Sequence, residues 1–180
     1  MSLSMARRLA VLSALVCPLA WAGTSEVEPN GSCAAAQDLG QTGAVSLSGT
    51  IGSADADFFT LKVAPGALLQ IDMRGAPSGA GTLPNMLMGL MDAGCAVQQY
   101  SDNSENGFEA KLVVVAPSDG VVRFAAGGNP DFAFTGTNTD TGTYTLTIGA
   151  PTGPVVGMSG RLRSEEHTSE LQSRVDISYA

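Results

Sequence analysis

The chain has 180 residues, and its 17 Asp and Glu outnumber its 9 Lys and Arg, which gives a formal net charge of −8 at pH 7. A chain this acidic, with no basic patch, repels phosphate backbones, so we expect no nucleic-acid partner. The single histidine, His167, lies in a C-terminal segment that we do not expect to belong to the fold. Its position argues against Ser-His-Asp and Cys-His catalysis and against a histidine-based zinc site.

The first 22 residues are typical of a secretory signal peptide that is removed on export. Two arginines at positions 7 and 8 precede an apolar run over residues 9–20, which is shorter than the roughly 20 residues of a membrane-spanning helix. Residues 20–22 form an A-x-A cleavage site. We therefore expect an exported protein, periplasmic or extracellular, without a membrane span, whose mature chain begins at Gly23.

The last 18 residues, 163–180, resemble a translated sequencing adapter. Adapter codons reproduce residues 163–173 and, after a gap of the size of an index, residues 177–180. The alternative is a genuine polar tail. We expect residues 163–180 to be disordered and residues 151–162 to begin a linker or a truncated continuation.

The residues between these two ends indicate an all-β domain. Short apolar runs, many of them alternating, recur between Gly, Pro, Asn and Asp, and only the alanine-rich residues 32–38 suggest a helical turn. We expect the polar stretch over residues 100–107 to form a loop. We expect Asp102, Glu105 and Glu109 to lie on a solvated face. About eight strands without long helices predict a jelly-roll-like antiparallel β-sandwich over residues 23–150. The clearest expected strands are residues 45–51, 58–63, 68–73, 87–91, 111–116, 121–125 and 144–148.

Two cysteines, Cys33 and Cys95, remain after removal of the signal peptide. In an oxidising compartment such a pair is most simply a disulfide. Two buried free thiols are the alternative.

Several short motifs, in their order and spacing, resemble the bacterial pre-peptidase C-terminal domain family. The resemblance covers residues 26–149. The motifs are Glu26-Val27-Glu28-Pro29-Asn30, Ala36-Gln37, Gly49-Thr50-Ile51, Asp55-Ala56-Asp57-Phe58-Phe59 and the closing Gly142-Thr143-Tyr144-Thr145-Leu146.

This resemblance implies a β-sandwich module that is attached to secreted peptidases and other exported proteins and is usually not catalytic. It also implies a calcium ion between the N-terminal segment and the sandwich, and Ca²⁺ takes six to eight hard oxygen ligands. Gly31 stands where the family usually has an acid, which predicts a weak site. The ligands implied are Glu26, Glu28 and Asn30 from the segment and Asp55 and Asp57 from the sandwich.

Simpler interpretations of these residues stay open. The Glu-Pro-Asn stretch can be an extended segment that leads into the first strand, with a proline that protects a sheet edge. Asp55 and Asp57 can belong to a solvated turn. We expect Phe58 and Phe59 to be core residues rather than a ligand platform, and Tyr100 and Tyr144 to be core or edge residues.

The function that we predict is a secreted, monomeric, non-catalytic accessory module that binds extracellular protein or polysaccharide and is stabilised by calcium. One alternative is the N-terminal module of a longer exported enzyme, such as a peptidase, whose catalytic domain is missing through truncation. Another is a small glycosidase that uses Asp55 and Asp57 as paired carboxylates.

Overall fold

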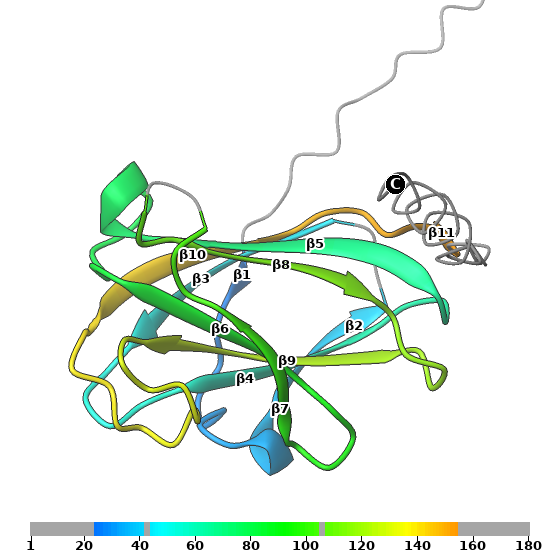
Figure 1. Cartoon of the computed structure of the whole chain (residues 1–180), viewed down its shortest axis with the longest axis horizontal. Coiled ribbons are helices and arrows are strands. Elements are labelled where there is room, and N and C mark those ends of the chain that lie inside the picture. Colours follow the sequence, from blue (N-terminus) through cyan, green and yellow to red (C-terminus); the bar gives the residue numbers. More distant parts are fainter. Residues whose placement is uncertain (1–23, 42–43, 105–106, 155–180) are drawn as a thin grey trace, which may run out of the picture.

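The computed structural model describes residues 24–41, 44–104 and 107–154, which form two packed β-sheets (Figure 1). The predicted signal peptide and the adapter-like tail lie outside these residues. Within them, no helix is long and apolar enough to cross a membrane. The strands are β1 (Thr24–Ser25), β2 (Gln37–Gln41), β3 (Val45–Ile51), β4 (Asp57–Lys62), β5 (Ala67–Arg74), β6 (Met86–Met91), β7 (Val97–Ser101), β8 (Ala110–Val115), β9 (Val121–Gly128), β10 (Gly142–Ile148) and β11 (Thr152–Pro154); two short 3-10 helices are η1 (Cys33–Ala35) and η2 (Ala76–Ser78).

The two sheets have the connectivity of a jelly roll. One sheet, which we call sheet A, has the order β1-β3-β10-β5-β11 with β8 on the other side of β5, and sheet B has the order β2-β4-β9-β6-β7. Every pairing among β3 to β10 is antiparallel. These eight strands confirm the predicted all-β sandwich.

Three short strands depart from the prediction. The pairs β1–β3 and β2–β4 are parallel, so both sheets are mixed rather than purely antiparallel. Residues 32–38 were expected to be helical, but only η1 is, with the Ser32 side chain accepting from the Ala35 amide, and β2 begins at Gln37. β11 pairs with β5 beyond residue 150, where the sequence suggests a linker. A fourth strand, β7, overlaps the stretch that was expected to be a loop. The sequence did not predict it because its mostly exposed residues lack an apolar alternation.

The main core lies between the sheets and follows the alternation of the strands. In β5, Leu69, Ile71 and Met73 are buried while the residues between them point outward. Phe59 stacks on Phe124 of sheet B with ring centroids 5.3 Å apart. Phe59 and Tyr144 are both in this core, as expected.

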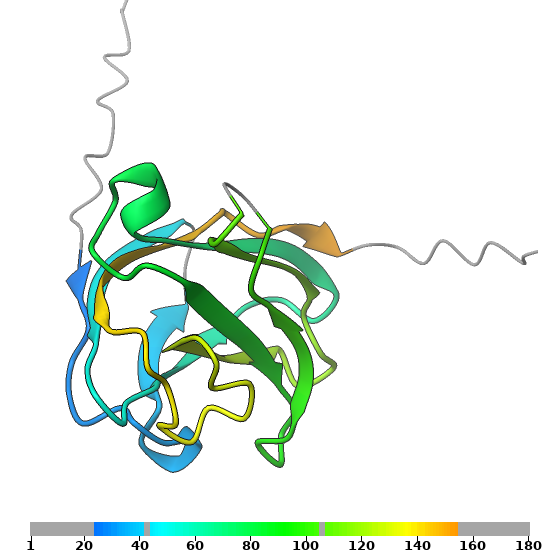
Figure 2. The same cartoon turned by 60° about the vertical axis from the view of Figure 1, so that its left-hand side comes forward.

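A second, smaller core covers the outer face of sheet B. It contains Phe58, Leu87 and Phe134, with Cys33 packed against it. The β9–β10 loop, which carries Phe134, and the N-terminal segment with η1 lie at the same end of the sandwich (Figure 2). A disulfide joins Cys33 to Cys95, which confirms the predicted pairing. The disulfide therefore ties the N-terminal segment to the turn between β6 and β7.

Breaking this disulfide should lower stability strongly. It closes a loop with a sequence separation of 62 residues, for which the chain-entropy model gives about 4 kcal/mol. We expect the Cys33→Ser, Cys95→Ser double variant to lose this much in urea denaturation at equilibrium. The wild type in reducing agent should lose about as much, whereas an unchanged midpoint would show that the bridge stabilises nothing.

Candidate metal site

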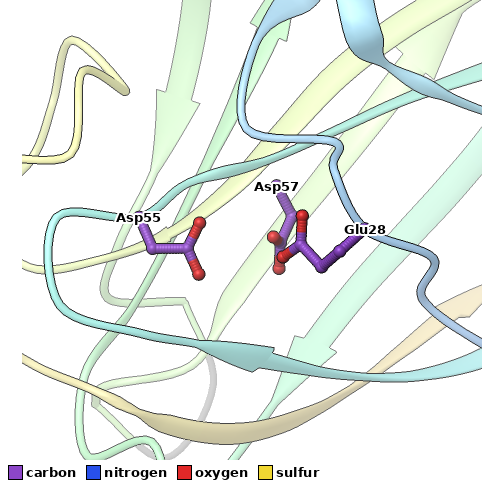
Figure 3. Close-up of side chains that lie close together, drawn as sticks. All are labelled: Glu28, Asp55 and Asp57. Atoms are coloured by element: carbon purple, nitrogen blue, oxygen red, sulfur yellow. The ribbon is translucent and has the colours of Figure 1, made fainter.

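Three acidic side chains from two parts of the chain converge at one end of sheet B. Glu28 lies between β1 and η1, Asp55 in the β3–β4 loop, and Asp57 at the first position of β4. One carboxylate oxygen from each lies within 4.8 Å of the others, and Figure 3 shows the carboxylates directed toward one another. The structure thus brings together three of the five predicted ligands.

Asn30, a fourth predicted ligand, is fully buried beside this group. Its main chain is held from both sides, since its amide donates to Glu28 Oε2 (2.8 Å) and its carbonyl accepts from the Phe58 amide (3.0 Å). Its side-chain oxygen and nitrogen, and Asp57 Oδ1, have no hydrogen-bond partner among the described residues. Leaving buried polar atoms unpaired costs about 1–3 kcal/mol each. An unpaired Asp57 oxygen among converging carboxylates, with the unpaired side chain of Asn30 on the same segment as Glu28, indicates a place for a cation.

Glu26, the fifth predicted ligand, lies beside the cluster and is engaged elsewhere. Its Oε1 accepts from the Thr50 amide (2.6 Å), and its Oε2 lies 3.0 Å from the Tyr144 hydroxyl. Glu26 therefore pins the N-terminal segment onto β3 and β10. In this arrangement it supports the ligands rather than joining them.

Tyr144 links the two acidic groups, a role that the sequence does not reveal. Its hydroxyl lies 2.7 Å from Asp57 Oδ2 and 3.0 Å from Glu26 Oε2, but it has only one proton to donate. Gly49 makes room for this contact, since a Cβ there would overlap the Tyr144 hydroxyl and ring carbon and the Glu26 carboxylate. With Asp57 Oδ2 held in this way, its Oδ1 remains for a cation.

The buried carboxyl group of Asp57 is hard to ionise. Burial, and next the interaction with the neighbouring Glu26 carboxyl group, raise the pKa of Asp57 to about 9, although the Tyr144 hydroxyl acts in the other direction. Burial also raises the pKa of Tyr144, so its hydroxyl stays protonated. Without a cation, Asp57 holds a proton at neutral pH, and a cation would take the place of that proton.

The β3–β4 loop that carries Asp55 is fixed from the β9–β10 loop. Asp55 Oδ2 accepts from the Gly52 amide (2.8 Å), while Asn138 accepts from the Asp55 amide (3.2 Å) and donates to the Gly52 carbonyl (2.9 Å). Sequence reasoning missed Asn138 because the two residues are 83 positions apart. Only the tertiary fold brings it to the site.

Asp131 shapes the loop that carries Asn138. It is buried, and its carboxylate accepts hydrogen bonds from Thr135, Gly136 and Thr137. Burial alone would raise the pKa of Asp131, but these hydrogen bonds outweigh it and lower the pKa. Asp131 is an internal acceptor for the loop, with its oxygens already engaged.

Glu109 corrects another expectation. It was expected on a solvated face, but it is 1% exposed, and its Oε1 lies 3.4 Å from the Gly75 amide that donates to it. Glu109 therefore closes the loop before η2 rather than facing solvent. Asp102 is partly exposed, and Glu105 lies outside the described residues.

The donor set of the candidate site consists of oxygen atoms. Carboxylates and an amide oxygen suit a hard cation such as Ca²⁺, and backbone carbonyls and water can complete its shell. A Cβ at Gly31 would lie 3.7 Å from the Ala56 carbonyl and 4.0 Å from Asp55 Oδ1, so a side chain at this position would begin beside Asp55 without a clash. The residues present fit calcium.

No family model and no curated protein sequence matches the chain. Among solved structures, a periplasmic inhibitor of g-type lysozyme from Aeromonas hydrophila has 13% identity over 63% of this chain and 97% of its own, with a TM-score of 0.43. The pre-peptidase C-terminal domain of a Bacillus anthracis collagenase has 20% identity over 63% and 93%, with a TM-score of 0.42. The Salmonella Typhimurium inhibitor of g-type lysozyme has 13% identity over 63% and 97%, with a TM-score of 0.39. Likenesses this weak transfer no function, so function is inferred from this chain's own residues.

Stability without metal should depend on the proton of Asp57. Because its pKa in the folded state lies above the ordinary value of 3.8, its contribution is present in full below about pH 4 and is lost as the pH rises through about 9. In metal-free buffer we expect the free energy of unfolding of the wild type to fall across this range more steeply than that of Asp57→Asn. Equal slopes in urea denaturation would contradict the assignment.

Filling the open position should strengthen the site. We expect Gly31→Asp to raise calcium affinity about tenfold, because a fifth oxygen side chain then borders Asp55. Isothermal titration calorimetry measures this directly. Gly153→Asp is the matched control, since a Cβ at Gly153 meets nothing within 4 Å and the added charge is the same. Equal affinity in the two variants would show that residue 31 does not face the ion.

Proposed function

We propose that this protein is an exported, non-catalytic binding module whose N-terminal segment is locked onto the sandwich by a calcium ion. The observation that carries the proposal is Asp57 Oδ1, which is buried without a partner in the group that Asp57 forms with Glu28 and Asp55. The buried side chain of Asn30, whose main-chain amide donates to Glu28, also has no partner. A bound Ca²⁺ would supply the partner that these side chains lack.

The calcium would act as a cross-link between two parts of the fold. Glu28 and Asn30 come from the segment, whereas Asp55 and Asp57 come from the sandwich. The segment is otherwise attached by the two-residue strand β1, by a few hydrogen bonds and by the disulfide. Ion binding would hold the segment in place, which matches what the pre-peptidase C-terminal resemblance implies.

Export is supported by the disulfide. Structural disulfides persist in oxidising compartments and are rare in the cytosol. The predicted signal peptide points the same way, although it lies outside the described residues. Periplasm and extracellular space are both compatible with it.

A binding role is favoured over catalysis by the arrangement of the acids. Paired carboxylates of glycosidases face each other across a sugar, roughly 5–9.5 Å apart. Here Asp55 and Asp57 share one compact group with Glu28, and Asp55 Oδ2 accepts from a backbone amide.

The second candidate function is the N-terminal module of a longer exported enzyme such as a peptidase. It is tested by reading the gene beyond Leu162.

Calcium should raise the thermal stability of the full chain. A ligand that binds only the folded state adds about 2.7 kcal/mol at a hundredfold excess over Kd, which corresponds to a rise in Tm of roughly 10 °C for a domain of this size. We expect this rise with millimolar Ca²⁺ relative to EGTA in scanning calorimetry. An unchanged Tm would overturn the calcium site.

The matched variants for this test are Asp55→Asn and Asp92→Asn. Both remove one acidic charge from a side chain that accepts a turn amide, but only Asp55 borders the site. Asp55→Asn should lose most of the calcium-dependent rise, and Asp92→Asn should keep it.

A further inference from the structure

Strand β8 is an edge of sheet A with part of its backbone directed away from the sheet. Among the described residues it pairs only with β5, where Ala116 donates to Ala67 and accepts from Gly66. Antiparallel strands alternate the direction of their backbone groups. Val113 and Val115 therefore point their N–H and C=O groups away from β5, where no other described strand meets them.

This edge lacks the features that usually protect one. Edge strands are commonly blunted by charges, proline or bulges, but β8 contains no proline and keeps continuous register with β5. Its single charge, Lys111, lies 3.5 Å from Asp72. Val113 and Val115 are 54% and 56% exposed on the outer face. At Val113 and Val115 the edge is thus an open, apolar template for another strand, whereas the amide of Lys111 at its beginning already donates to Ser101 Oγ (3.0 Å).

A cavity of about 350 Å³ adjoins the inner side of the same edge. It lies between β8, the turn into β9 and the β6–β7 turn, and its apolar walls include Leu90, Val114 and Val122. A strand added to β8 would direct alternate side chains to the two faces of sheet A. One set would enter this cavity, and the other would cover the exposed valines.

The charges at the mouth of the cavity indicate the character of the incoming strand. Arg123 is paired with Asp119 at 2.9 Å, whereas Asp92 is held by neutral donors, the amides of Gly94 and Ala96. The mouth is therefore net acidic, and the whole chain carries −8. Two copies of so acidic a chain repel each other, while a basic partner is attracted.

We propose that the β8 edge docks an extended, basic segment of another exported polypeptide, which adds to sheet A as a further strand. Backbone hydrogen bonds to Val113 and Val115 would hold it, and alternate apolar side chains would fill the cavity. This inference rests on the proposed binding function and names the surface and the class of partner.

The test uses the full chain loaded with calcium and a fluorescein-labelled nine-residue peptide of alternating Val and Lys. We expect saturable binding by fluorescence anisotropy that weakens with salt, slowed hydrogen exchange at the amides of Val113 and Val115, and at least tenfold weaker binding of the same peptide with Glu in place of Lys. Equal binding of both peptides, or unchanged exchange at these amides, would overturn the proposal.

Variants at one position separate strand addition from general charge attraction. Val113→Pro removes the outward N–H without a change of charge and should abolish peptide binding, whereas Val113→Ala keeps the N–H and should retain most of it. Equal binding by both variants would overturn the proposal. The calcium-dependent rise in Tm, measured on the same samples, shows that each variant is folded.

Light scattering on the chain without peptide tests whether a second copy of the chain occupies the β8 edge instead. If the chain is a monomer at about 100 µM, the result supports docking of a different polypeptide. A dimer that Val113→Pro dissociates would mean that β8 pairs with a second copy, which would overturn the basic partner. Peptide binding and the calcium response are separate readouts, so loss of binding with an intact calcium response overturns only this inference.

Discussion

The burial of the Asp57 carboxyl group is the constraint on which the N-terminal half of the structure depends. This group sits at the base of β4, fully excluded from water, and charge there is tolerated only if a proton, a hydroxyl donor or a cation compensates it. Tyr144 from the last long strand supplies the donor, and Glu28 and Asn30 arrive from the opposite end of the chain. One buried acid thereby holds the first segment, β4 and β10 together.

The second core explains why the N-terminal segment is part of the fold rather than an appendage. Phe58 follows Asp57 on β4 and points to the outer face of sheet B, where Phe134 and the Cys33–Cys95 bridge cover it. The polar site and this apolar layer are neighbours in sequence, since Asn30 precedes Cys33 by three residues. Movement of the segment would expose the apolar layer and dismantle the polar site together.

Much of the fold and of the candidate site could be predicted from the sequence, because these features depend on the local period of apolar residues or on the order of motifs. The apolar runs of β3 to β6 and β8 to β10 predicted the sandwich. The family resemblance implied a group of Glu28, Asn30, Asp55 and Asp57 together with Glu26, which the structure places beside this group. The hydrogen bonds of Tyr144, Asn138 and Glu109 could not be predicted, because each joins residues that are far apart in the sequence. The short strands β1, β2 and β11 were missed since they carry too few residues to show a period.

The pairing of β3 with β10 has a consequence for the order in which the protein folds. Val45 lies opposite Ile148, so the strand that opens the jelly roll finds its partner only when the last long strand has been made. Pairing of strands this far apart in the sequence first costs the conformational entropy of closing a long loop. The stabilising contacts form only afterwards, which makes folding slow. Strand β3 therefore stays without its β10 partner while most of the chain is being made. The centre of sheet A forms only after almost the whole domain is available.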